Sequence, residues 1–230
     1  MSDNDAARQV VPSKRVIHTF RKKLRVWGKR NFRSFLWRQT NDPYQILMAE
    51  VMLHRTQVSQ VVPVYESFIS QYPNLSQFLQ AGLTDLKASL QSLGLHWRIE
   101  LLYQMGQTIT ERFGKQIPTE KDDLLSLPGV SKYIASAVRC FAWNLPEPLI
   151  DTNTVRIIGR VFGWEVKDSS RRNSRFRQAL ATLVDPDEPR AYNYAMLDLA
   201  HLICLKKQSP LCDRCPLIAI CNFGQSAKSA

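Results

Sequence analysis

Two stretches near the middle of the chain decide the fold: residues 127–138 read LPGVSKYIASAV, and residues 149–153 read LIDTN. The first predicts a tight turn between two helices, because Pro128 ends one helix and Gly129 supplies backbone freedom. N–H groups at the start of the next helix can bind a phosphate, and Lys132 adds a positive charge there. A Pro-Gly pair between helices is also an ordinary turn, so other residues must decide its function.

The second stretch places a carboxylate directly before a predicted helix. Asp151 follows an apolar pair and precedes the helix expected at residues 152–162. Asp is a preferred N-cap, which gives it a purely structural role. A carboxylate held rigidly at a cavity mouth can also stabilise positive charge on a substrate. These residues alone leave both roles open.

Helical periodicity dominates the sequence, and no segment shows sustained strand alternation. The spacing predicts helices over residues 13–27, 44–58, 61–72, 74–80, 84–92, 97–113, 121–125, 132–143, 152–162, 174–184 and 191–205. We therefore expect an all-α protein. Its 230 residues allow one large domain or two small ones.

The predicted helix at residues 44–58 is apolar on nearly every side, which indicates burial. Its polar residues Glu50, His54 and Gln57 are spaced to form one stripe. A carboxylate in such a helix is costly unless it is paired or faces a polar cavity. Glu50 is thus either a satisfied structural residue or part of an active-site pocket.

Four of the five cysteines lie in the last 27 residues, with spacers of seven, two and five residues: Cys204, Cys212, Cys215 and Cys221. In a reducing compartment, this clustering predicts a metal site rather than disulfides. Four thiolates can hold zinc or a [4Fe–4S] cluster. The remaining Cys140 is expected in the core.

The formal net charge of +11 favours a polyanionic partner. Residues 14–38 contain ten basic residues and no acidic one, although a solvated helix face has the same pattern. No apolar run approaches the roughly 20 residues of a membrane span, and no signal-peptide core is present. We expect a cytoplasmic, nucleoid-associated protein with a disordered leader at residues 1–12 and a disordered tail at 225–230.

Residues 127–138, followed by Asp151, resemble the helix–hairpin–helix and Gly/Pro-Asp signature of the endonuclease III-like DNA glycosylase superfamily. Residues 36–44 are similar to the entry to that family's first barrel helix, and residues 50–58 to its Glu-centred helix. The four-cysteine loop resembles the family's [4Fe–4S] loop. The resemblance covers about residues 16–224, nearly the whole chain.

This resemblance implies two helical domains with the active-site cleft between them. The central barrel-like domain, containing the hairpin, would span residues 38–150. The discontinuous iron–sulfur domain would combine residues 13–37 with 151–224. The resemblance also selects a [4Fe–4S] cluster over zinc, although the family's usual first cysteine spacer has six residues rather than seven.

The resemblance also assigns catalytic roles. Asp151 would stabilise positive charge at the sugar C1′, and Glu50 would protonate the leaving base or orient water, with its apolar surroundings expected to raise its pKa. Tyr133 stands where the lyase-competent branch carries a nucleophilic lysine. Tyrosine cannot form a Schiff base, so we expect little or no AP-lyase activity. The alternative role of Tyr133 is packing as a buried aromatic side chain.

The partner implied is double-stranded DNA with a mismatched or damaged base, bound by a monomer that flips the base out of the stack. The implied DNA-binding residues are Gly129, Val130, Ser131 and Lys132 in the hairpin, Arg55 in the gap left by the base, and Leu95 and His96 against the opposite strand.

Glu50, Tyr133 and Asp151, in a short chain, resemble mismatch glycosylases that remove thymine or uracil opposite guanine. The alternatives are an adenine glycosylase acting opposite 8-oxoguanine or guanine and, in another class, a non-catalytic binder of distorted DNA.

Overall fold

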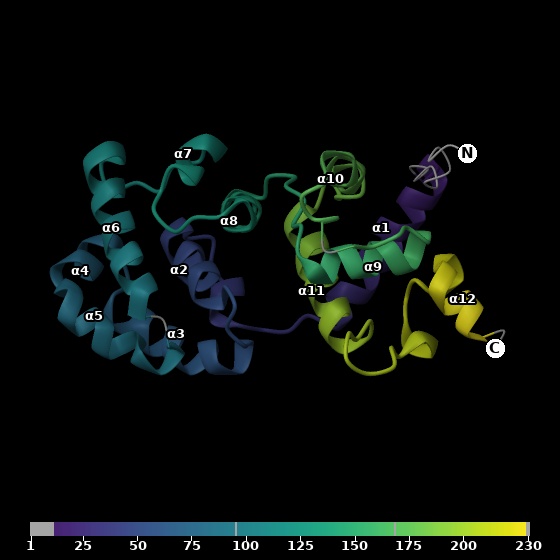
Figure 1. Ribbon diagram of the computed structural model, residues 1–230, viewed down its shortest axis with the longest axis horizontal. Coiled ribbons are helices and arrows are strands. Elements are labelled where there is room, and N and C mark those ends of the chain that lie inside the picture. The colour runs from purple at the N-terminus through teal and green to yellow at the C-terminus, as the bar shows by residue number, and fades with distance from the viewer. Residues whose placement is uncertain (1–11, 95, 168, 229–230) are drawn as a thin grey trace, which may run out of the picture. The chain divides into compact units, whose positions relative to one another are not determined.

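The computed structural model describes residues 12–94, 96–167 and 169–228. Within these ranges it contains twelve α-helices, four short 3-10 turns and no strand, which confirms the all-α prediction (Figure 1). The chain divides into a middle unit, residues 34–145, and an end unit built from the residues on either side. The sequence motifs predict these two boundaries after residues 37 and 150, four and five residues later along the chain. In the described part, no helix is long and apolar enough to cross a membrane.

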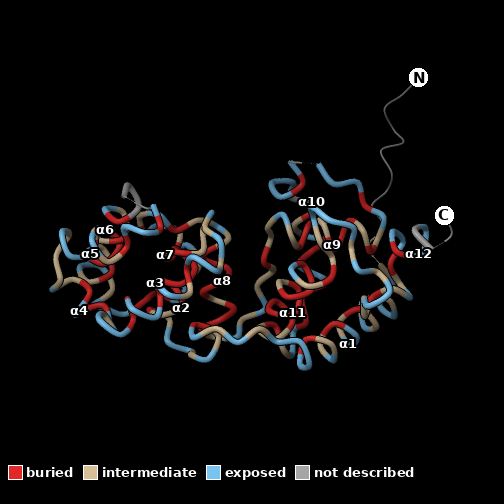
Figure 2. The backbone as a smooth tube through the Cα atoms, turned by 90° about the horizontal axis from the view of Figure 1, so that it is seen from below, coloured by how far each residue is buried: buried red, intermediate tan, exposed pale blue. Residues whose placement is uncertain are grey.

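The middle unit is organised around one buried helix. Its elements are the 3-10 turns Leu36–Arg38 and Gln91–Leu93 and the helices α2 (Pro43–Leu53), α3 (Val58–Gln71), α4 (Leu75–Gln80), α5 (Gly82–Leu90), α6 (His96–Phe113), α7 (Lys121–Leu125) and α8 (Lys132–Trp143). Helix α2 packs against α3 and α8 and is buried along most of its length (Figure 2). Asp42 caps it by accepting hydrogen bonds from the N–H groups of Tyr44 and Gln45.

Helix α2 ends five residues earlier than the sequence pattern predicted. Its last residue is Leu53, and the next helix begins at Val58. Between them Arg55 adopts a left-handed backbone with φ 65°, a conformation that ends helices but is usually taken by glycine. His54 and Gln57 therefore lie outside the helix, and the predicted Glu50–His54–Gln57 helical stripe is wrong.

The end unit combines the first helix with the last third of the chain. Its elements are α1 (Lys14–Arg30), α9 (Thr152–Phe162), α10 (Ser174–Ala181), α11 (Pro189–Leu202), the 3-10 turns Cys212–Arg214 and Ile218–Ile220, and α12 (Asn222–Lys228). Helix α1 crosses α11 so closely that a Cβ on Gly28 would lie 2.6 Å from the Cβ of Ala195. Phe20, Leu24 and Leu199 are fully buried beneath this crossing.

The C-terminal helix α12 was not predicted. It begins one residue after Cys221, so residues 225–228, expected in a disordered tail, are helical. The backbone N–H of Gly224 donates to Cys221 Sγ at 3.4 Å, and the Phe223 ring lies 4.9 Å from the Arg160 guanidinium. The contact between Phe223 and Arg160 joins residues far apart in the sequence, so the local sequence pattern did not predict it.

Candidate active site and cysteine loop

The helix–hairpin–helix forms as the sequence predicts. Helix α7 ends at Leu125, the turn follows, and α8 begins at Lys132. Gly129 has φ 78°, the left-handed region that an L side chain adopts only with strain. Ser131 caps α8 because its Oγ accepts a hydrogen bond from the N–H of Ile134 at 3.3 Å. Lys132 is exposed on the first turn, so the hairpin offers a cation beside a helix N-terminus.

A small pocket of about 90 Å³ lies beside this hairpin within the middle unit. Pro128 and Gly129 form part of its wall, together with His54 and Leu101. A Cβ on Gly129 would lie 3.6 Å from that of Leu101, which is an ordinary contact. Backbone conformation rather than space therefore requires glycine here. The pocket also shows that the end of α2 reaches the hairpin turn.

Asp151 is the N-cap of α9, and its carboxylate is held by three donors. Its Oδ1 accepts from the backbone N–H groups of Asn153 at 2.9 Å and Thr154 at 2.8 Å, and its Oδ2 accepts from Asn153 Nδ2 at 2.7 Å. Thr154 Oγ1 accepts from the Asp151 N–H at 3.1 Å, which completes a capping box. The structural role expected of Asp151 is thus present, and it fixes the orientation of a half-buried carboxylate.

Hydrogen bonds connect Asp151 with the cysteine loop. Asn153, which donates to Asp151, accepts from Arg156 Nη1 at 3.0 Å. The same guanidinium donates through Nε to the Cys204 carbonyl at 3.0 Å and through Nη2 to that of Ala200 at 3.2 Å. Asn153 and Arg156 therefore link the carboxylate side chain to the backbone at the first cysteine.

Glu50 lies in the interior of α2, with 5% of its surface exposed. Its neighbours in the helix, Ala49 and Val51, are buried too. Tyr133, in the first turn of α8, is half-buried, and Arg55 is exposed in the turn after α2. Leu95 and the side chain of His96 lie outside the described parts of the chain.

The four clustered cysteines line one cavity of about 20 Å³ in the end unit: Cys204, Cys212, Cys215 and Cys221. Arg160 and Phe223 contribute to the same wall. Arg160 Nη1 donates to Cys204 Sγ at 3.3 Å and to the Leu205 carbonyl at 2.8 Å. Among the described residues, however, no three His, Cys, Asp or Glu side chains form a group that could hold a metal ion.

The thiols interact electrostatically across this cavity. Burial raises the pKa of Cys215 to about 11, and the charges of Cys221, Cys204 and Cys212 act in the same direction. Burial likewise raises the pKa of Cys221. Thiolates this close together need a bound cation to become stable, and metal binding would release their protons. Four thiols lining one cavity, with N–H groups directed at two of the sulfurs, are thus the donor type of a sulfur-ligated metal group, although the described side chains are not gathered into a metal site.

The long first cysteine spacer is accommodated in a closed loop. The N–H of Leu211 donates to the Ile203 carbonyl at 2.9 Å and closes the base of this loop. Lys206 and Lys207 are exposed at its tip. The seventh spacer residue therefore extends an exposed loop without displacing the cysteines from their common cavity.

The predicted site residues fall into two groups. Glu50, Arg55, the hairpin and Tyr133 belong to the middle unit, whereas Asp151 and the cysteines belong to the end unit. Sequence reasoning missed Asn153, Arg156 and Arg160 as partners of Asp151 and Cys204. The i, i+4 spacing of the two arginines places them on one face of α9, and this was the available signal.

Comparison with known proteins identifies the family. Residues 48–184, which contain the hairpin and Asp151, match the family model described as HhH-GPD superfamily base excision DNA repair protein. This chain belongs to the HhH-GPD superfamily. The resemblance inferred from the sequence motifs is confirmed, and a DNA-repair family makes DNA the partner.

Individual HhH-GPD relatives carry more specific names. A thymine/uracil-DNA glycosylase of Pyrobaculum aerophilum is 40% identical over 196 residues, which cover 82% of this chain and 84% of the relative. An adenine DNA glycosylase of Buchnera aphidicola subsp. Schizaphis graminum is 30% identical over 207 residues, or 89% of this chain and 59% of that relative. The solved structure of a thermostable thymine-DNA glycosylase matches with a TM-score of 0.86 at 27% identity, covering 92% of this chain and 98% of that one.

Proposed function

We propose that this protein is a monofunctional DNA glycosylase that acts as a monomer and removes thymine or uracil mispaired with guanine. The oriented carboxylate of Asp151 at the start of α9 carries the proposal. The 40% identity to a thymine/uracil-DNA glycosylase, over most of both chains, supports the choice of base. The adenine glycosylase relative is 30% identical, against 40% for the thymine/uracil-DNA glycosylase, which favours the mismatch reaction over adenine removal.

Asp151 would supply the electrostatic stabilisation. Breaking the N-glycosidic bond develops positive charge at C1′ of the sugar, and a carboxylate fixed nearby stabilises that charge without reorganising. The three hydrogen bonds to Asp151 hold its two oxygens in one orientation. The same carboxylate can direct the attacking water.

Glu50 would act on the other side of the bond. A departing pyrimidine leaves with negative charge unless it receives a proton, and a positioned carboxyl group can provide one or orient water. The burial of Glu50 in α2 keeps its carboxyl away from bulk solvent. The presence of both carboxylates argues against a binder of distorted DNA that has lost its activity.

Tyr133 would limit the reaction to base removal. Cleavage of the sugar–phosphate strand by an AP lyase requires an amine that forms a Schiff base with C1′. The phenol of Tyr133 cannot do so, and successive residues on a helix point about 100° apart, which directs Lys132 elsewhere. The product should be an intact strand with an abasic site.

DNA binding would begin at the hairpin. Backbone groups of Gly129, Val130 and Ser131 would hold a phosphate, with Lys132 beside them. Arg55 would enter the gap left by the flipped base, and Leu95 and His96 would separate the opposite strand. Such insertions offset part of the cost of unstacking, a few kcal/mol.

The four cysteines would hold a [4Fe–4S] cluster: Cys204, Cys212, Cys215 and Cys221. When bound, this group supplies four metal–thiolate bonds that brace the loop, without taking part in glycosidic chemistry. Arg156 and Arg160, which hydrogen-bond to the loop at Cys204, join it to α9.

A panel of duplexes tests the proposed function. Duplexes containing T·G, U·G, A·G, A·8-oxoguanine or an oxidised pyrimidine are incubated with the protein and then treated with hot alkali, which breaks strands at abasic sites. We expect breakage of the T·G and U·G duplexes. Preferential breakage at adenine would establish the alternative, and no breakage with retained DNA binding would indicate a non-catalytic binder.

A further inference from the structure

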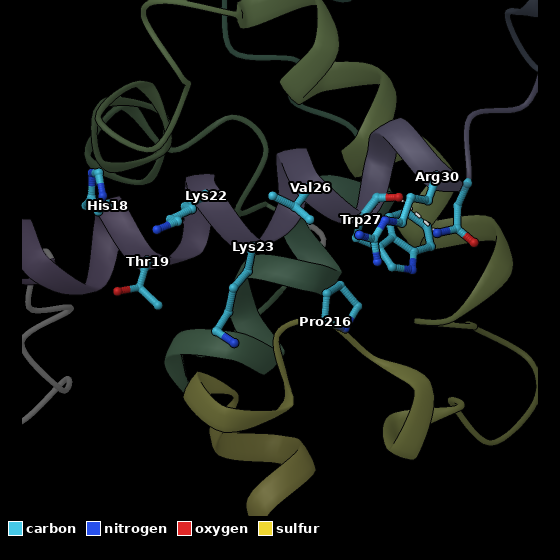
Figure 3. A pocket seen from close by; sticks show the side chains of 9 residues that line it. His18, Thr19, Lys22, Lys23, Val26, Trp27, Arg30 and Pro216 are labelled. Carbon is cyan, nitrogen blue, oxygen red and sulfur yellow. Dashed lines mark hydrogen bonds between the residues drawn. The ribbon is translucent and has the colours of Figure 1, made fainter.

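The outer face of α1 carries a groove that the proposed glycosylase reaction does not use. It has a volume of about 760 Å³ and lies wholly in the end unit. Figure 3 shows its wall, formed by α1 and by Pro216 of the cysteine loop. The lining residues of α1 and its C-cap come in adjacent pairs that recur every four positions from residue 18 to residue 31, so they form one helical face. From residue 18 to residue 30 this face is about 18 Å long.

The basic side chains of α1 lie on two sides of the helix. On one side Arg21 donates to the Thr182 carbonyl at 2.6 Å, and Arg25 and Lys29 form ion pairs with Glu188, both at 3.8 Å. These positive charges are therefore engaged in contacts within the end unit. They bind α1 to the segment between α10 and α11.

On the groove side the cations are not neutralised. Lys22, Lys23 and Arg30 are exposed, and none forms an ion pair within the described part of the chain. Among the described residues, no acidic side chain lines the groove. Its potential is therefore positive, and an anionic ligand complements it.

The middle of the groove is apolar. Val26 is 49% exposed, and Trp27 and Pro216 are half-buried around it. The lysines lie one turn before this apolar patch and Arg30 one turn after it, as Figure 3 shows. Solvent-exposed apolar surface rimmed by polar residues is typical of a protein-binding site, and Trp and Arg are enriched in the residues that dominate such binding.

We propose that this groove binds an acidic protein segment in a helical conformation, about twelve residues long, with an apolar anchor at its centre and Asp or Glu on both sides. The anchor would cover Val26 and contact Trp27 and Pro216, and the flanking carboxylates would pair with Lys22, Lys23 and Arg30. Duplex DNA fits less well, because its polar surface of phosphates and sugars offers no side chain to cover Val26.

The test uses the full chain and a synthetic probe. The probe is a fluorescein-labelled peptide of about twelve residues with a central Leu-Leu-Phe sequence flanked by Asp and Glu, and the control peptide carries Ser in place of these three residues. Fluorescence anisotropy measures the affinity of each. We expect the apolar peptide to bind at least about tenfold more tightly than the control.

Paired variants locate the binding site. The double variant K22E/K23E should weaken peptide binding at least about tenfold, and Val26→Ser about fivefold. The control K14E/R15E makes the same change in net charge on exposed residues of α1 outside the groove, and it should change peptide affinity less than about twofold. Both double variants should reduce affinity for undamaged duplex DNA equally. Val26→Ser leaves the charge unchanged and keeps the test valid if K22E/K23E does not fold.

Three results would overturn the proposal. Equal peptide affinities in the two double variants would mean that net charge alone attracts the peptide. Equal affinities for the apolar peptide and the Ser control peptide would mean that the apolar centre does not contribute to binding. A larger loss of duplex affinity in K22E/K23E than in K14E/R15E would make nucleic acid the occupant. None of these results depends on base removal, so the proposed glycosylase activity can stand or fall separately.

Discussion

Helices α2 and α9 each contain 11 residues and each positions one carboxylate, but they do so in opposite ways. Helix α2 is buried along most of its length, and Glu50 lies within it. Helix α9 is amphipathic, and Asp151 precedes its first turn, where three donors hold it. An apolar helix isolates a carboxyl group from water, whereas a helix N-terminus complements its negative charge. We therefore infer that Glu50 transfers a proton and that Asp151 stabilises positive charge.

The largest expected effect comes from removing the charge at α9. Asp151→Asn keeps the size of the side chain and a preferred N-cap residue, but it cannot stabilise positive charge at C1′. We expect the single-turnover rate of base release from a T·G duplex to fall at least about 10³-fold. Duplex affinity, measured by anisotropy, should stay within about threefold, because the hairpin is unchanged. Cleavage at the wild-type rate would remove Asp151 from the mechanism.

The corresponding change in α2 should have a smaller effect. Glu50→Gln removes a group that can transfer a proton, and we expect the single-turnover rate to fall about 10²-fold. The matched control is Glu66→Gln on an exposed face of α3, which should leave the rate unchanged. If Glu50→Gln lowers thermal stability and leaves the rate unchanged, Glu50 is a structural residue of the α2 core.

The partner of Asp151 provides a finer test of the α9 side. Asn153→Ala removes the donor at 2.7 Å from Asp151 Oδ2, and we expect the rate of base release to fall about tenfold, since hydrogen bonds to charged groups contribute about 1.5–3 kcal/mol. Asn173→Ala is the control, because Asn173 caps α10 in the same unit and accepts from the N–H of Phe176. That variant should lose about 1 kcal/mol of folding stability and keep its rate. Equal effects of the two variants on the rate would show that Asn153 acts only through stability.

The smallest effect is expected at the capping box. Thr154→Val removes the hydroxyl group that accepts from the Asp151 N–H. We expect a loss of about 1 kcal/mol in the free energy of unfolding, measured by urea titration. The rate of base release should change less than about threefold, because all three donors to the Asp151 carboxylate remain. A much larger loss of rate would mean that the backbone N–H of Asp151 must be held for catalysis.

The sequence predicted the elements whose ends carry strong local signals. Ser131 and Asp151 are both preferred N-cap residues, and the helices that follow them have the predicted bounds, 132–143 and 152–162. Ser131 belongs to the hairpin motif, and Asp151 is the predicted catalytic carboxylate, so both are also predicted site residues. The structure confirms both residues as N-caps, and their roles in DNA binding and catalysis stay predictions.

The elements that the sequence missed depend on unusual backbone or distant contacts. Arg55 ends α2 in a left-handed backbone conformation, and the sequence has no glycine there that would have predicted the end of the helix. Helix α12 has a distant contact between the Phe223 ring and the Arg160 guanidinium. The hydrogen bond from Arg156 to the Cys204 carbonyl joins residues 48 positions apart, which periodicity and capping rules do not address.

One experiment tests the central claim of base removal without strand cleavage most directly. A T·G duplex labelled on the thymine strand is incubated with excess wild-type protein, and strand breaks are counted over time with and without hot alkali. We predict that alkali breaks the strand at the position of the thymine as the reaction proceeds, while strands without alkali treatment stay intact. An unbroken strand after alkali would contradict the proposed glycosylase activity on T·G. Breaks without alkali would contradict the role assigned to Tyr133.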